Sequence, residues 1–303
     1  MVSVVIPCHN CANFIDRAIC SVMAQSYTDI EIILVNNNST DNTLRILNYY
    51  QKKYPHCVSV YSEYKRGAPA ARNCGLQQAK GEWVQFLDAD DELAESKILR
   101  QVQLGDNYEA DIIAGACLLK YATPQKTYDV YRPVDDDIWK GLITSNLGIT
   151  SSNLWRREAL LQVNGWNERF SSSQEYDLLF RMIKNGAKVI ADEQFNTIVH
   201  FSGNSVSKTS NKERLEEILN NRIELRLAIK NELMLRGLLT PGLLLSIDTY
   251  IYSELVNNAD QVSDYAYSLL KKYHLNVKLE TVLKLKGKMY LKKLLRIVDS
   301  IQA

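Results

Sequence analysis

No uninterrupted apolar run in the 303 residues approaches the roughly 20 residues that a membrane-spanning helix needs, so the sequence predicts none. The first residues, Val2 to Ile6, predict a strand, and neither a basic segment nor a small-residue cleavage site precedes them. We therefore expect a cytoplasmic protein without a signal peptide, with contact at the inner face of the membrane left open. The formal net charge of +1 predicts no general attraction to nucleic acid.

Two patterns that carry chemistry in other proteins are also missing. The six cysteines include one C-x-x-C pair, Cys8 and Cys11, but no second pair at the spacing of a zinc site. Because a cytosolic protein keeps its thiols reduced, we expect small buried or loop residues rather than a redox or zinc centre. No G-x-G-x-x-G follows a predicted strand, which argues against a dinucleotide-dependent oxidoreductase.

The first part of the chain alternates between apolar runs that predict strands and apolar residues at helical spacing. Repeated βα units predict an α/β fold with a mainly parallel sheet flanked by helices. With 46% hydrophobic and 23% charged residues the chain can build a sizeable soluble core. The expected strands are 2–6, 31–35, 58–61 and 83–87, and the expected helices between them are 15–23, 40–47 and 69–79.

The pattern changes towards the C-terminus. After about residue 211 glycine is sparse, strand signals vanish and helical spacing continues to the end. We therefore predict a domain of residues 1–210 and a helical C-terminal region of residues 211–303. Before that boundary, strands are expected within 111–132 and at 151–156, 189–190 and 197–199, and a helix at 175–185.

An acidic cluster follows the predicted strand 83–87 directly: Asp88, Asp90, Asp91 and Glu92. Burying unpaired carboxylates is costly, so we expect the cluster at the exposed end of the strand, where a cation balances it. Ligands of open α/β sheets bind beyond the carboxyl ends of the strands. An oxygen-only group suits Mg²⁺ or Mn²⁺ better than Zn²⁺. The alternative is an acidic turn that caps the next helix.

Five segments follow one another in order: Val4 to Asn10, Leu34 to Thr43, Gly67 to Asn73, Phe86 to Asp91 and Gln174 to Arg181. Together they resemble the family 2 glycosyltransferases of the GT-A fold. Each motif alone is weak, whereas five in one order are specific, and they cover about the first 200 residues. The resemblance implies a donor activated as a nucleotide sugar and transfer that inverts the anomeric centre.

The resemblance implies that the loop from Pro7 to Asn10 lies beside the nucleobase and ribose. The family usually has paired aspartates where this chain has Asn36 and Asn37. An amide offers both an acceptor and donors, so Asn37 could accept from the imide N–H of uracil and donate to a ring carbonyl. A uridine or thymidine base is therefore expected, and a UDP-linked donor is the leading candidate. In the alternative, Asn36 and Asn38 only shape a turn and cap a helix.

The diphosphate side of the predicted site contains Arg72, whose planar guanidinium the resemblance places near the nucleotide. Asp90 is the leading ligand for Mn²⁺ or Mg²⁺, and Asp88 would reach the ribose, or the metal through water. Asp91 either supports these two or stays solvated. The resemblance also offers the late His200 as a metal ligand, against the alternative of a hydrogen-bonded histidine in an ordinary loop.

Glu175 and Asp177 compete for the role of the base that deprotonates the acceptor hydroxyl. On a helix their side chains point about 200° apart, so only one can face the donor. The family commonly has an aspartate at the place of Glu175, which favours that residue, while Asp177 could instead support the helix. Trp155 and Trp166 flank this region and either stack on sugars or pack in the core.

The sequence thus predicts a metal-dependent, inverting glycosyltransferase acting on an acceptor hydroxyl in bacterial surface-polysaccharide synthesis. The acceptor would be a saccharide or a lipid-linked saccharide. The first alternative is a sugar-phosphate nucleotidyltransferase, although the loop from Pro7 to Asn10 lacks the expected glycines and basic residues. The second is a non-catalytic module that binds a sugar nucleotide.

The C-terminal tail is rich in lysine, with apolar residues between the charges. A basic amphipathic helix of this kind can lie on anionic lipid, which would give peripheral membrane contact through the C-terminal helices. The alternative is a solvated charged face on a packed helix. The basic residues are Lys284, Lys286, Lys288, Lys292, Lys293 and Arg296, and the apolar ones are Leu291, Leu294, Leu295 and Val298.

Overall fold

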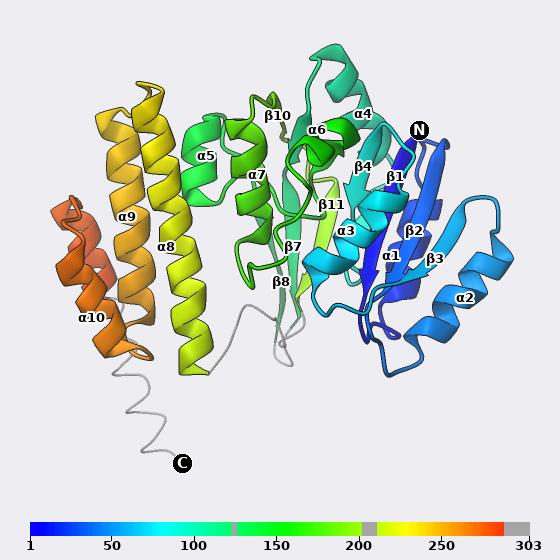
Figure 1. Cartoon of the computed structure of the whole chain (residues 1–303), viewed down its shortest axis with the longest axis horizontal. Helices are drawn as coiled ribbons and strands as arrows, with labels where there is room; N and C mark the ends of the chain where they lie inside the picture. The colour runs from blue at the N-terminus through cyan, green and yellow to red at the C-terminus, as the bar shows by residue number, and fades with distance from the viewer. Residues whose placement is uncertain (123–125, 202–210, 288–303) are drawn as a thin grey trace. The chain divides into compact units, whose positions relative to one another are not determined.

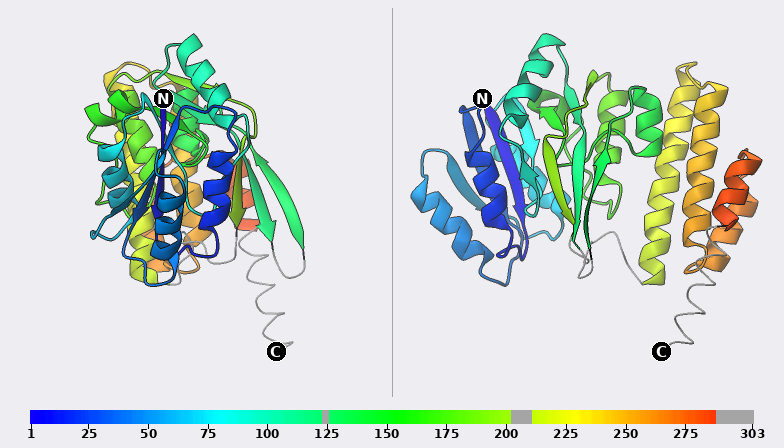
Figure 2. Two further views of the ribbon diagram at one scale, coloured as in Figure 1. Left: turned by 90° about the vertical axis from the view of Figure 1, so that its right-hand side faces the viewer. Right: turned by 180° about the vertical axis from the view of Figure 1, so that it is seen from behind.

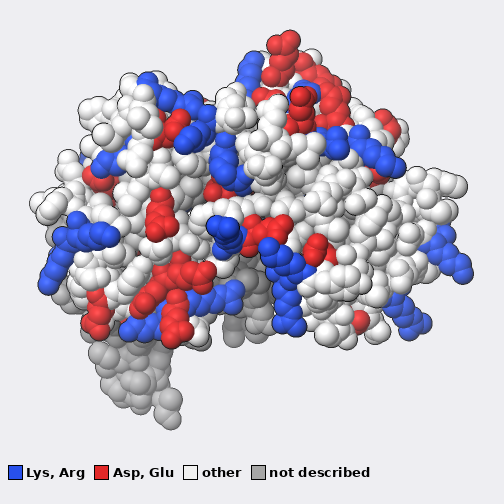
Figure 3. Space-filling model, in the orientation of Figure 1, with Lys and Arg blue, Asp and Glu red and all other residues white. Residues whose placement is uncertain are grey.

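The computed structural model describes residues 1–122, 126–201 and 211–287. The chain divides into two compact units, Met1–Ser205 and Val206–Ala303. The predicted pair of folding domains, with its boundary near residue 210, stays a prediction. Acidic and basic side chains are interspersed over the face shown in Figure 3, as the balanced composition leads one to expect.

Within residues 1–122 and 126–201 the main sheet of the first unit has seven strands, in the order β10-β6-β9-β4-β1-β2-β3 (Figure 1). The pairs β4–β1, β1–β2, β2–β3 and β10–β6 are parallel, and β9 runs antiparallel between β4 and β6. The predicted mainly parallel α/β sheet is therefore confirmed. The strands are Val2–Cys8, Ile30–Asn36, Val58–Ser62, Trp83–Phe86, Ile112–Gly115, Leu154–Arg156 and Val189–Asp192, for β1, β2, β3, β4, β6, β9 and β10.

Both faces of the sheet are covered, because alternate residues of the central strand β1 are buried against helices on opposite sides. Val4 belongs to the apolar cluster that includes Ile15 and Leu47 of the helices α1 and α2. Val5 faces α3, where a Cβ added to Gly75 would lie 2.3 Å from Cγ1 of Val5, so this helix needs a glycine for its close approach. The helices of this unit are Ile15–Met23, Thr43–Lys53, Ala68–Gln78, Lys97–Asn107, Ile138–Thr144, Arg157–Gln162 and Gln174–Lys184, for α1 to α7.

A second sheet, in the order β5-β11-β7-β8, also lies in the described part of this unit (Figure 2). The sequence signals did not separate it from the first sheet. The two-residue strand β5 begins with Glu92, the last acid of the cluster, and pairs antiparallel with β11, so His200 on β11 belongs to the same local structure as the acids. The strands are Glu92–Leu93, Cys117–Ala122, Thr127–Arg132 and Thr197–Phe201, for β5, β7, β8 and β11.

The second unit is helical in its described residues, as the sequence predicts. Its helices are Lys212–Leu235, Pro241–Asn258 and Ser263–Lys272, for α8 to α10. Among the described residues no helix is both long and apolar enough to cross a membrane. Of the predicted basic amphipathic segment, Lys284 and Lys286 are described, whereas its remaining basic and apolar residues, from position 288 on, lie outside the described residues. The same is true of the residues 202–207 that follow His200.

Candidate active site

The candidate site lies at the carboxyl edge of the main sheet, where three neighbouring parallel strands end. Cys8 at the end of β1 pairs with Asn36 at the end of β2, and Phe86 at the end of β4 pairs with Val5. The segments that follow these strands therefore leave the sheet at one edge. This is where open α/β sheets bind ligands.

The loops after β1 and β2 are joined by hydrogen bonds. The backbone N–H of Asn37 donates to the carbonyl of Cys8 at 2.7 Å, and Nδ1 of His9 lies 2.7 Å from the carbonyl oxygen of Asn37. Asn10 has a φ of 47°, and its Oδ1 accepts from the backbone N–H of Thr40 at 2.8 Å. The segment from Pro7 to Asn10 is thus shaped by the second strand's loop, and its role beside a nucleoside stays a prediction.

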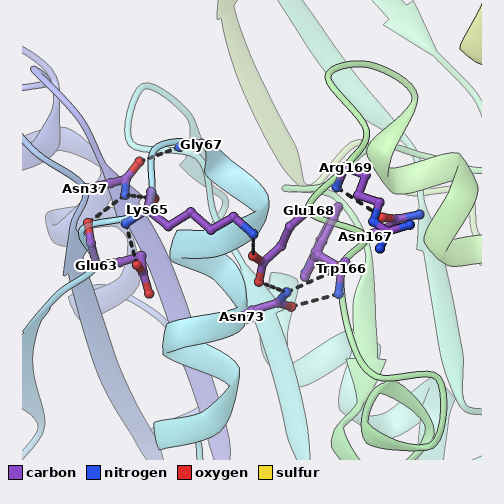
Figure 4. Close-up of polar contacts among 9 residues, drawn as sticks. All are labelled: Asn37, Glu63, Lys65, Gly67, Asn73, Trp166, Asn167, Glu168 and Arg169. Atoms are coloured by element: carbon purple, nitrogen blue, oxygen red, sulfur yellow. Dashed lines mark hydrogen bonds and ion pairs between the residues drawn. The ribbon is translucent and has the colours of Figure 1, made fainter.

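The side-chain amide of Asn37 is hydrogen-bonded to the backbone of residues 63–67 (Figure 4). Its Nδ2 donates to the carbonyls of Glu63 and Lys65, at 2.8 and 2.7 Å, and its Oδ1 accepts from the N–H of Gly67 at 2.9 Å. A carboxylate could not donate to two carbonyls, which explains why an amide suits this position. Both N–H groups are used, so the expected donation to a ring carbonyl would require breaking one of these bonds.

The loop that Asn37 holds is connected to the segment before α7 (Figure 4). Nζ of Lys65 lies 2.6 Å from Oε2 of Glu168, and Nδ2 of Asn73 on α3 donates to Oε1 of the same carboxylate at 2.7 Å. These two partners lower the pKa of Glu168. Asn73 also bonds the backbone N–H and carbonyl of Trp166. One polar network therefore runs from the end of β2 to the segment that leads into α7.

Arg72 is the centre of the site's charged contacts. Its Nη2 lies 2.7 Å from Oδ1 of Asp88, its Nη1 donates to Oε1 of Gln174 at 3.2 Å, and its guanidinium lies 4.5 Å from the ring centre of Trp166. The side chain is almost completely buried. Trp166 and Trp155 are buried too, at 2% and 0% exposure, so neither stacks on a sugar and both pack in the core.

Asp90 is the exposed carboxylate of the cluster. Its side chain makes no hydrogen bond or ion pair with another described residue. Partial enclosure and the neighbouring carboxylate of Asp88 raise the pKa of Asp90, against the opposing effects of Arg17 and His200. Nε2 of His200 lies 3.0 Å from Oε1 of Glu92. Burial and Arg17 lower the pKa of His200, although Glu92 opposes them.

Within the described residues no group of three or more His, Cys, Asp or Glu side chains forms a ready-made metal site. Mg²⁺ is usually held by one or two carboxylates together with substrate phosphates, and Mn²⁺ prefers the same oxygen ligands. Asp90 and Asp88 fit that arrangement, and His200 lies near Asp90. Asp91 is only 3% exposed, so the expectation that it could stay solvated is wrong.

The two competing acids occupy different surroundings in the first turn of α7. Asp177 is buried, and its Oδ2 lies 2.8 Å from Nε of Arg181, which also donates to the carbonyl of Val163 at 2.7 Å. Burial raises the pKa of Asp177, against the effect of Arg181. Glu175 is half-buried, and its side chain makes no hydrogen bond or ion pair with another described residue. The geometry therefore leaves Glu175 as the acid that can meet a ligand.

Three strands that end in a polar edge, an exposed acid and an arginine paired with its neighbour define an α/β protein with a candidate ligand site at the carboxyl edge of its sheet. Residues 3–167 match the family model described as "Glycosyl transferase family 2". The chain belongs to glycosyl transferase family 2, and its fold is that of the GT-A transferases.

Relatives and solved structures agree with this assignment. The chain is 38% identical over 102 residues to the Escherichia coli UDP-Glc:alpha-D-GlcNAc-diphosphoundecaprenol beta-1,3-glucosyltransferase WfaP, covering 34% of this chain and 40% of that protein. The structure of S. aureus TarS 1-349 in complex with UDP-GlcNAc superposes with a TM-score of 0.61 at 19% identity, covering 92% of this chain and 76% of that one. The mannosyltransferase PcManGT from Pyrobaculum calidifontis, in complex with GDP-Man and Mn²⁺, gives 0.59 at 17% identity, covering 96% and 79%.

The chain spans well under half of the first curated relatives it matches, between 18% and 41% of their length.

Two features of the site had no signal in the sequence. Gln174 contacts Arg72 across 102 positions of the chain, and Ser151 lies under the acidic cluster, 60 positions from Asp91. A single sequence shows neither contact because both pairs are brought together only by the sheet.

Proposed function

We propose that this protein is a metal-dependent, inverting glycosyltransferase that moves a sugar from a UDP-linked donor to the hydroxyl of a lipid-linked saccharide. The observation that carries the proposal is the bridge made by Arg72, which contacts Asp88 beyond β4 and Gln174 at the start of α7. Through these two contacts Asp88 lies close to the first turn of α7, which contains Glu175. WfaP, by its name, uses UDP-glucose and a diphosphoundecaprenol-linked acceptor, which supports both substrate classes.

In the proposed reaction the acceptor hydroxyl oxygen forms a bond to the anomeric carbon while the bond from that carbon to the diphosphate breaks. Glu175 takes the hydroxyl proton, and UDP leaves on the opposite face of the sugar, so the anomeric centre inverts. Asp90 and Asp88 would hold a divalent ion, Mn²⁺ or Mg²⁺, which when bound stabilises the charge that develops on the diphosphate. Arg72 orients Asp88 from the protein side.

A thermal-shift screen with UDP, GDP and ADP, each with and without Mn²⁺, tests the donor assignment. We expect UDP with Mn²⁺ to raise Tm by about 5 °C at a hundredfold excess over Kd, because a ligand bound only by the folded protein stabilises it. GDP and ADP should give smaller shifts, and UDP without the ion should give little. Equal shifts for the three nucleotides would contradict the uridine assignment.

Product analysis of the same mixtures separates transfer from the alternative reaction. With a UDP-sugar and an acceptor, a transferase releases UDP, whereas a nucleotidyltransferase exchanges pyrophosphate. A pure binding module shows the Tm shift and releases neither product.

Peripheral contact with the inner face of the membrane is part of the proposal, for a cytoplasmic enzyme whose acceptor is lipid-linked. The α8–α9 turn, taken as residues 234–238 and so including the last two residues of α8, supports it, because Met234, Leu235 and Leu238 are 59%, 83% and 45% exposed there. Exposed apolar clusters of this kind mark interaction sites. The only charged residue between Leu233 and Ile247 is Arg236, a cation that suits anionic lipid.

Co-sedimentation with vesicles that contain anionic phospholipid tests the membrane contact. We expect Leu235→Gln to lower the bound fraction several-fold, because it removes the most exposed apolar side chain of the turn. Leu161→Gln, at a 43% exposed leucine of the first unit, is the matched control and should leave binding unchanged. Equal binding of both variants and the unmodified protein would contradict contact through this turn.

A further inference from the structure

A completely buried serine, Ser151, lies directly beneath the acidic cluster. Its hydroxyl accepts a hydrogen bond from the backbone N–H of Asp88 at 3.1 Å. The same hydroxyl donates its one proton to Oδ2 of Asp91 at 2.6 Å. Ser151 therefore uses both its acceptor and its donor on the short segment that contains Asp90, and alanine could replace neither contact.

Asp91 completes the support from the other side. Its backbone N–H donates to the carbonyl of Asp88 at 3.0 Å, which closes a tight turn around Asp90. The backbone of His200 on β11 also lies close enough to this carboxylate to lower its pKa, which burial and the charge of Asp88 nevertheless raise. The carboxylate is buried among protein donors, so it holds the acidic segment, the loop that contains Ser151 and β11 together. It has no face open to a metal ion or a diphosphate.

The position of Ser151 is in turn set from within the sheet. Its carbonyl accepts from Nε2 of Gln85 on β4 at 2.9 Å and lies 3.5 Å from the hydroxyl of Thr197 on β11. Oε1 of Gln85 accepts from Nζ of the fully buried Lys97. Because β4 and β11 hold the backbone of Ser151, and Lys97 on α4 holds Gln85, the serine has little freedom to move and gives the acidic turn a rigid support.

We propose that Ser151 and Asp91 are positioning residues. They fix the turn around Asp90 so that Asp88 and Asp90 meet the metal-bound diphosphate, and neither Ser151 nor Asp91 touches the metal or the diphosphate. This inference rests on the proposed function, because it assigns Asp90 and Asp88 to the metal and nucleotide. Partners that orient metal ligands typically change metal affinity by 10- to 100-fold when they are removed. An acid that is itself a ligand would need an open face, which Asp91 lacks.

Calorimetric titration of Mn²⁺ with UDP into the 303-residue chain tests the inference without relying on turnover. We expect Ser151→Ala to weaken metal-dependent UDP binding by about tenfold or more, with its fold retained. Ser151→Thr, which keeps the hydroxyl, should restore most of the loss. With a UDP-sugar, KM for the donor should rise in Ser151→Ala more than kcat falls.

Ser152 provides the matched control, because it is equally buried and its hydroxyl bonds Ile149 rather than the acidic turn. Ser152→Ala should lose a similar amount of stability, measured as Tm, and keep the unmodified affinity. Equal weakening in the two alanine variants, or unchanged affinity in Ser151→Ala, would overturn the inference. Should Ser151→Ala not fold, Asp91→Asn carries the same expectation, because it replaces one acceptor oxygen by a donor. If the unmodified protein shows no metal-dependent UDP binding, the proposed function fails, and this inference with it.

Discussion

Replacing Glu175 by alanine is expected to lower kcat by about 10²- to 10⁴-fold, the usual contribution of a positioned general base. The side chain is half-buried and makes no hydrogen bond or ion pair with another described residue, so its loss should leave Tm nearly unchanged. Binding of UDP with Mn²⁺ should also persist, because Glu175 is assigned to the acceptor hydroxyl and not to the nucleotide. Initial rates at saturating donor, with Tm measured on the same sample, check this expectation.

Asp177→Ala is the matched variant, two positions away on the same helix. Its carboxylate is paired with Arg181, so the substitution leaves a largely buried guanidinium without its charged partner. We expect a loss of about 1–3 kcal/mol in the free energy of unfolding, with kcat retained in the folded fraction. A larger fall in kcat for Asp177→Ala than for Glu175→Ala, in fully folded samples, would reverse the two roles.

Asp90→Ala is expected to lower kcat/KM by at least about 10³-fold, because the metal supplies several kcal/mol of stabilisation to the leaving diphosphate. The exposed carboxylate makes no bond with another described side chain, so the fold should be intact. The variant should also resemble the unmodified protein treated with a chelator, with no further loss when both are combined. Rates measured over a range of Mn²⁺ concentrations, with circular dichroism as the fold check, provide the test.

Asp106→Ala serves as the control for this change, since Asp106 is an exposed acid near the end of α4, away from the strand ends that form the site. Its rate and its response to Mn²⁺ should equal those of the unmodified protein. Turnover by Asp90→Ala at the unmodified rate would remove the metal role from this residue.

The order of strands and helices in the first half of the chain was predictable because each is a local pattern. The runs at residues 31–35 and 83–87 became β2 and β4 to within one residue at most of their borders. The small second sheet was not predictable, since β5 has two residues and β8 is exposed along nearly its whole length. Short or solvent-facing strands carry no apolar alternation, so only their partners reveal them.

The site was predictable in its residue types and less so in their contacts. Asn37 was expected to offer donors to a base, but its donors are used by the backbone of residues 63–65. The sequence left open whether Trp155 and Trp166 stack on sugars or pack in the core, and their burial shows that they pack in the core. For Asp91 the sequence left open whether it supports Asp88 and Asp90 or stays solvated, and its burial and its contact with Ser151 favour the support.

Composition and local pattern alone settled that this chain builds an α/β sheet whose fourth strand ends in acids, because strand formation and the chemistry of a D-x-D segment depend on neighbours in the sequence. Which acid faces solvent, which is paired and which is buried was decided only by the folded protein. The physical reason is that a carboxylate's state depends on the donors and the water around it. Most of these donors lie far from the acids in the sequence and contact them only in the folded protein, as Arg72, Ser151 and the backbone of β11 do. Arg181 contacts Asp177 across one turn of helix.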